Sequence, residues 1–167
     1  MDSDAHWNAL HEQAEDYAGF NLIFCDGDTL GYFSNRGLHR RSLEPGLYAL
    51  SNHFLDTPWP KVTRVKQALA DQLQLAWDTE SLLALMRHRE PAADEDLPDT
   101  GIGQEWERML SPAFIVSEKY GTRCSSLIRM DRHGEFSFIE RSFGTDGGAT
   151  STRKFSFTPD FHEHREA

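Results

Sequence analysis

The sequence of 167 residues contains 17 basic and 27 acidic side chains, for a formal net charge of −10, and 38% of its residues are hydrophobic. This composition predicts a single domain over residues 1–167 with a packed core, and it excludes disordered, collagen-like and linker classes. No apolar run approaches the roughly 18 residues of a membrane-spanning helix, and the first residues lack the pattern of a signal peptide. We therefore expect a soluble cytoplasmic protein that does not span a membrane.

The negative charge is concentrated in two segments. Residues 1–16 contain five acidic side chains and residues 90–107 contain seven, and neither segment contains Lys or Arg. This charge argues against a nucleic-acid partner, because phosphate binding requires clustered basic side chains. We expect residues 90–103 to form an acidic surface loop and residues 158–167 to form a polar tail.

In chain order, the first predicted element is a helix over residues 6–17, whose apolar face consists of Trp7, Leu10, Ala14 and Tyr17. Two strands over residues 20–25 and 29–34 then form a hairpin around a turn at 26–28. The short apolar run at residues 47–50 predicts a third strand.

The middle of the chain predicts two helices. The first begins at Thr57 and Pro58, with a capping hydroxyl followed by proline, and continues to Ala76. The second begins at Asp78 and Thr79.

Strands are predicted in the last third at residues 113–116, 122–130, 135–141 and 154–157. The order of elements favours an α+β fold, and the bulky apolar residues on both faces of several strands predict sheets covered on both sides.

The cysteines and histidines give no pattern of a metal site or cofactor site. Cys25 and Cys124 lie in predicted strands, where we expect them to pack as small apolar side chains. His162 and His164 are expected to belong to the polar tail.

Two polar residues are candidates for chemistry. Asn52 follows an apolar run directly before a predicted helix, where its amide could donate to a developing oxyanion; local turn hydrogen bonds explain it equally well. Arg123 begins a predicted strand and could bind a carboxylate or phosphate, although an exposed arginine is common at such a position.

Six ordered motifs resemble the NRDE family, also called the transport and Golgi organisation protein 2 family. They are YAGFNL at 17–22, FSNR at 33–36, GLYALSN at 46–52, LDTPWPK at 55–61, YGTR at 120–123 and ERSF at 140–143. The resemblance extends from about Ala5 to Phe157 and covers the C-terminal two-thirds or so of the family domain, so we expect a domain incomplete at its N-terminus.

This resemblance implies a four-layer αββα sandwich similar to the N-terminal-nucleophile hydrolases. Related amide hydrolases use an N-terminal cysteine as nucleophile. Here the second residue is Asp2, so the nucleophile is absent. Asn52 would correspond to the oxyanion-hole asparagine, and Asn21 and Arg123 to substrate-binding residues.

Two functions follow as hypotheses. In an intact protein the fold could hydrolyse a small-molecule amide or acyl thioester, with this chain alone inactive. Alternatively, the chain is a noncatalytic module that binds a lipid, acyl-CoA or haem, since eukaryotic relatives are linked with Golgi organisation and secretion.

Overall fold

The computed structural model describes residues 3–25, 29–37 and 39–158. The described part of the chain divides into two compact units, one that ends at Thr57 and one that begins at Pro58. The predicted hairpin turn at 26–28 and the histidines at 162 and 164 lie outside the described residues, as does all but the first residue of the predicted tail. The structure is α+β, with two small antiparallel sheets and helices, as predicted.

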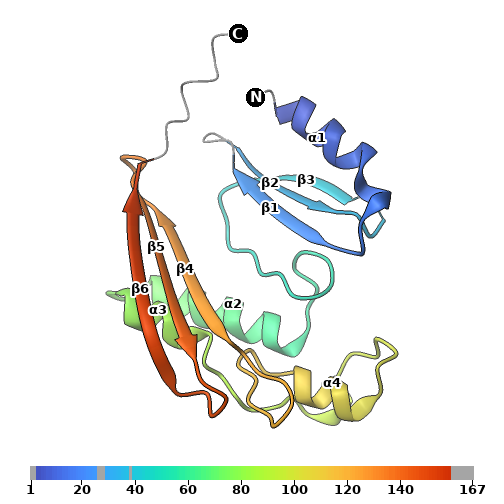
Figure 1. Cartoon of the computed structure of the whole chain (residues 1–167), viewed down its shortest axis with the longest axis vertical. Coiled ribbons are helices and arrows are strands. Elements are labelled where there is room, and N and C mark those ends of the chain that lie inside the picture. Colours follow the sequence, from blue (N-terminus) through green and yellow to red (C-terminus); the bar gives the residue numbers. More distant parts are fainter. Residues whose placement is uncertain (1–2, 26–28, 38, 159–167) are drawn as a thin grey trace. The chain divides into compact units, whose positions relative to one another are not determined.

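The first unit packs a helix on a three-stranded antiparallel sheet (Figure 1). The helical segment is α1 (Ser3–Glu12), followed by the 3-10 turn η1 (Ala14–Asp16). The sheet has the order β1 (Asn21–Cys25), β2 (Leu30–Ser34) and β3 (His39–Leu43). The core consists of Trp7, Ala14 and Phe33, against which Leu10, Phe20, Leu22 and Phe24 pack. This packing confirms the first two predicted strands and the apolar face of Trp7, Leu10 and Ala14. The predicted end of the helix at residue 17 is wrong, because α1 ends at Glu12 and Tyr17 is exposed.

The prediction of a third strand at residues 47–50 is wrong. The third strand is β3, four of whose five residues are polar and exposed, so it carries no apolar alternation that would mark it in the sequence. β3 pairs along the whole of β2, with Tyr32 opposite Arg41. Residues 47–50 are half-buried without strand pairing, and the guanidinium of Arg41 lies 5.5 Å from the centre of the Tyr48 ring.

The second unit combines three helices with another antiparallel sheet. The helices are α2 (Pro60–Leu73), α3 (Thr79–Leu85) and α4 (Gln104–Leu110), with the 3-10 turn η2 (Asp94–Asp96) before α4. The sheet has the order β4 (Cys124–Met130), β5 (Phe136–Phe143) and β6 (Ala149–Phe157). No described helix is both long and apolar enough to cross a membrane.

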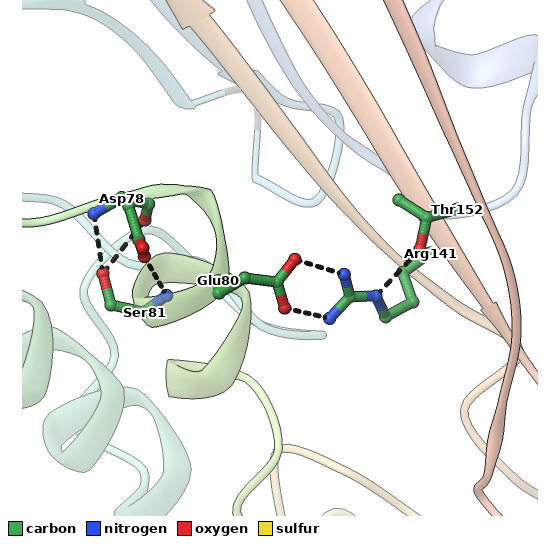
Figure 2. Close-up of polar contacts among 5 residues, drawn as sticks. All are labelled: Asp78, Glu80, Ser81, Arg141 and Thr152. Atoms are coloured by element: carbon green, nitrogen blue, oxygen red, sulfur yellow. Dashed lines mark hydrogen bonds and ion pairs between the residues drawn. The ribbon is translucent and has the colours of Figure 1, made fainter.

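The helix starts were predicted with mixed success. Asp78 caps α3 as predicted: its carboxylate accepts the Ser81 amide at 2.8 Å, and the Ser81 hydroxyl accepts the Asp78 amide at 2.9 Å (Figure 2). The predicted start of α2, with Thr57 as the cap and Pro58 as the first helical residue, is two residues too early. Pro60 takes the first helical position, because the Thr57 hydroxyl donates to the Phe54 carbonyl at 2.9 Å and so belongs to the preceding loop.

Two other predictions in this unit are corrected. Residues 113–116 form no strand beyond a single bridge between Val116 and Gly121. Helix α4 was not predicted for two reasons. It directly follows an acidic segment with proline and glycine, and only three of its seven side chains are apolar. Strands β4 and β5 are confirmed, and β6 begins five residues earlier than expected because its first half is rich in Thr and Ser.

The two faces of the second sheet differ. Ile139 and Phe143 are buried on the face that packs with α3, whose Glu80 holds Arg141 of β5 through two hydrogen bonds of 2.8 and 2.6 Å (Figure 2). On the other face the described part of the second unit leaves apolar side chains exposed, namely Ile128, Met130, Phe155 and Phe157. The expectation that both faces are covered is therefore not met within this unit.

The packing predicted for the cysteines is wrong. Cys25 is the last residue of β1 and Cys124 the first of β4, and both are exposed and form no disulfide. Strand ends extend beyond the packed centre of a sheet, so their side chains remain accessible.

Candidate functional site

Asn52 lies in a closed loop formed by residues 49–56, here called the Asn52 loop. The Asp56 amide donates to the Ala49 carbonyl at 2.8 Å, and the Ala49 amide donates to Asp56 Oδ1 at 2.9 Å. Asp56 has a φ of 59°, a left-handed conformation that Asp adopts more readily than most residues. These two hydrogen bonds join the ends of the loop and fix the segment that carries Asn52.

A chain of hydrogen bonds ties the Asn52 loop to the first sheet. The Leu55 amide donates to the Tyr32 hydroxyl at 3.2 Å, and this hydroxyl donates to Asn21 Oδ1 at 2.8 Å. Asn21 Nδ2 then donates to the His53 carbonyl at 3.0 Å. Because Tyr32 is 97% buried from solvent at the centre of the sheet, it gives the loop a rigid support.

Asn21 and Asn52 differ in what their amides are free to do. Asn21 uses its oxygen and one amide hydrogen to hold the loop. Asn52 is exposed, and its side chain makes no hydrogen bond with any described residue. Its amide hydrogens are thus available to a bound group.

His53 and Thr57 lie beside Asn52 and resemble a base and nucleophile at first inspection, with His53 Nδ1 2.8 Å from Thr57 Oγ1. The Thr57 hydroxyl, however, donates its single proton to the Phe54 carbonyl, which can only accept. His53 Nδ1 therefore carries a proton and donates to Thr57. The pair closes the loop and does not activate the hydroxyl.

Arg123 belongs to the second unit, where it directly precedes β4. Its side chain is exposed and makes no hydrogen bond among the described residues, while its carbonyl accepts the Phe143 amide at 2.8 Å. It lines a small cavity of about 100 Å³ together with Lys119 and the turn before it. Ser117 fixes that turn by donating its hydroxyl to the Tyr120 carbonyl at 2.6 Å.

The structure therefore brings Asn21 and the Asn52 loop together within the first unit, and it places Arg123 in the second. Sequence reasoning missed Tyr32 and the loop-closing role of Asp56. The position of Asp56 directly before Thr57 and Pro58 was a signal for a turn, since aspartate is typical of turns as well as of helix starts. In the described part of the chain, no group of three or more His, Cys, Asp or Glu side chains could hold a metal ion.

Comparisons with known proteins agree with these motifs. The sequence profile of the family described as Transport and Golgi organisation 2 matches residues 1–145. The chain is 33% identical to the human Transport and Golgi organization protein 2 homolog, with 95% of this chain and 63% of the human protein covered. It is 32% identical to the bovine homolog, with 94% and 63% covered. The chain thus spans about 63% of the length of these curated relatives. It belongs to the Transport and Golgi organisation 2 family.

Proposed function

We propose that Asn52 is the oxyanion donor of a site for amide or thioester hydrolysis in an intact protein of this family. The observation that carries the proposal is an exposed amide without a partner among the described residues, on a loop closed by Asp56 and supported by Tyr32. A donor held in place before the reaction stabilises a developing negative charge without reorganisation. Asn21 would then position Asn52 through the loop that it holds, and the substrate-binding role of Arg123 stays a prediction from the family resemblance.

In this proposal the fold is the four-layer αββα sandwich of the N-terminal-nucleophile hydrolases, with residues 1–167 as the greater part of one domain. Support comes from the face of the β4-β5-β6 sheet that the described part of the second unit leaves exposed, where Phe155 and Phe157 stack on Phe138 and Phe136. A face of this kind is typical of the inner side of two packed sheets. We also propose a cytoplasmic location for this protein.

The nucleophile of such an enzyme would be an N-terminal cysteine thiolate, which attacks the carbonyl carbon and releases an amine or thiol. This chain has Asp2 in that region. We propose that residues 1–167 by themselves are inactive, and that an extended form to which the uncovered part of the bovine relative is added is active.

The experiment compares this chain, the extended form and the full-length bovine relative with a panel of amides and acyl thioesters. Intact mass spectrometry should detect an acyl adduct on the two longer proteins and none on this chain. In the extended form, Asn52→Ala should lower kcat by about 10²–10³-fold. A bovine protein that forms no adduct with any substrate would contradict the hydrolase proposal.

The second candidate function is a noncatalytic module that binds a lipid, acyl-CoA or haem and serves in transport. It is favoured by the same exposed apolar face, which offers aromatic surface to an apolar ligand, and by the transport and Golgi names of the relatives. Titration of this chain with acyl-CoA and with haem, followed by tryptophan fluorescence, tests it. Saturable binding without any acyl adduct supports this function, and no response to either ligand rejects it.

A further inference from the structure

The second unit contains a cavity of about 370 Å³ that the functions considered above do not use. It lies between the segment that leads into α3 and the face of the β4-β5-β6 sheet that packs with α3. Its volume falls within the range typical of small-molecule sites. Every residue that lines it belongs to the second unit, so the cavity is independent of the Asn52 loop.

Two cations lie at diagonal positions of this sheet face. Across the three strands, one row reads Arg129, Ser137 and Ser156, and the next reads Leu127, Ile139 and Lys154. All six residues line the cavity. The two serines are short, which leaves room between the long side chains of Arg129 and Lys154 on the outer strands.

Arg129 and Lys154 are available to a ligand. Both side chains are exposed, and neither makes a hydrogen bond or ion pair with a described residue. Arg141, which follows in the next row of β5, is different, because both oxygens of Glu80 accept hydrogen bonds from its guanidinium (Figure 2). The Glu80–Arg141 pair joins α3 to the sheet and makes no hydrogen bond with Arg129 or Lys154, although the charge of Glu80 also attracts Lys154.

Among the described residues that line the cavity, Asp78 is the one carboxylate. Its Oδ1 accepts the Ser81 amide, which orients it along the start of α3. Two cations against one carboxylate leave the lining with a net positive charge, although the whole chain is strongly acidic.

The same cavity has an apolar wall. Trp77 remains 40% exposed at one side, and Leu127 and Ile139 lie in the same row of the sheet as Lys154. An aromatic ring beside aliphatic side chains favours a flat apolar body, whereas Arg and Lys bind carboxylate or phosphate oxygens.

We propose that this cavity binds a small organic anion that joins a flat apolar ring system to a carboxylate or phosphate group. The anionic group lies between Arg129 and Lys154, with the Ser137 hydroxyl as an additional donor. The ring packs between Trp77 and the Leu127–Ile139 pair.

Isothermal titration calorimetry on the full chain tests this proposal with three probes of the same ring size: naphthalene carboxylate, naphthyl phosphate and the neutral naphthalene carboxamide. We expect the anions to bind at least about tenfold more tightly than the carboxamide, since a charged hydrogen-bonding group distinguishes them. The tighter of the two anions identifies the group that the site prefers. Absence of binding by both anions, or equal binding of the carboxamide, overturns the proposal.

The variants Arg129→Gln and Lys154→Gln, alone and combined, identify the site. The control is Arg153→Gln, which removes the same charge from β6 one residue away, on the opposite face and opposite Glu140. The double variant should raise the Kd of the anions by about tenfold or more, and the control by less than about twofold. Circular dichroism spectra confirm that the variants fold. Equal losses in the control and the double variant would show a diffuse charge effect and overturn the site.

Discussion

The hydroxyl of Tyr32 supports the Asn52 loop through Asn21: it donates to Asn21 Oδ1 at 2.8 Å and accepts the Leu55 amide at 3.2 Å. A single buried hydroxyl therefore connects the middle strand of the first sheet with both sides of the loop. Its removal leaves a donor and an acceptor without partners, which costs more than the hydrogen bonds themselves contribute.

Tyr32→Phe should therefore destabilise the first unit by about 1–3 kcal/mol and speed hydrogen exchange of the Leu55 amide. The matched control is Tyr48→Phe, which removes a hydroxyl that donates to the Glu44 carbonyl at 2.9 Å in an exposed setting. Urea unfolding and amide exchange measure both effects. The role of Tyr32 would be refuted if Tyr48→Phe lowered the free energy of unfolding as much as Tyr32→Phe, or if the exchange rate of the Leu55 amide in Tyr32→Phe stayed unchanged.

Asp56 contributes to the same loop through its side chain and its backbone conformation. Asp56→Asn keeps an oxygen that accepts the Ala49 amide hydrogen, and asparagine tolerates the left-handed φ. Its stability should therefore remain closest to that of the parent. Asp56→Gly loses the oxygen and should cost about 1 kcal/mol. Asp56→Ala loses the oxygen and keeps the strain, for a total of about 2–3 kcal/mol. Thermal unfolding of the three variants checks this order, and a stability of the Ala variant above that of the Gly variant would contradict it.

The parts of this fold that the sequence predicted are those specified by neighbouring residues. The β1–β2 hairpin and the β4–β5 pair combine apolar strands with turn residues, and the Asp78 cap needs only Ser81 three positions later. Strand β3 was not predicted because its residues are mostly polar and show no apolar alternation. It forms a strand by pairing with β2.

The candidate site shows the same division. Asn52 could be identified from its place after an apolar run, but the partners that fix its loop come from strands distant in the sequence. The role of Tyr32 depends on hydrogen bonds to residues distant in the sequence and leaves no local signal, whereas Asp56 before Thr57 and Pro58 was itself a local turn signal. The cavity beside Trp77 likewise depends on the register of three strands.

The Glu80–Arg141 pair predicts a pH dependence of stability. The hydrogen bonds from Arg141 are the largest cause that lowers the pKa of the Glu80 carboxyl below its usual value. A carboxyl with a lowered pKa in the folded state stabilises the protein fully above its unfolded pKa, and this stabilisation is lost as pH falls through the folded value. Glu80→Gln should therefore be less stable than the parent at pH 7, with the difference vanishing in strong acid.

The control for this measurement is Glu135→Gln, because the exposed Glu135 carboxylate makes no hydrogen bond or ion pair with the described residues. Urea unfolding at several pH values, repeated at about 1 M salt to screen the pair, gives the comparison. A difference between the parent and Glu80→Gln that does not change with pH would show that the pair contributes through packing alone.

Gly147 and Gly134 provide a test of how closely the second unit packs around its turns. Both have a positive φ, of 72° and 79°, so an alanine at either position suffers similar backbone strain. A Cβ at Gly147 would lie 2.7 Å from Arg89 Nη2 and 2.7 Å from Val116, whereas a Cβ at Gly134 would meet nothing within 4 Å. The Gly147 carbonyl also accepts hydrogen bonds from Arg87 at 3.1 Å and Arg89 at 3.0 Å.

Gly134→Ala should accordingly cost about 1–2 kcal/mol from backbone strain alone. Gly147→Ala should cost a further 1–3 kcal/mol or so, because the new methyl group displaces the Arg89 guanidinium and crowds the contact with Phe114. Chemical unfolding measures both losses, and proteolysis at the turn of residues 144–148 reports whether the arginines still hold it. Equal losses in the two variants would contradict this close packing, since their backbone strain is matched and only the surrounding space differs.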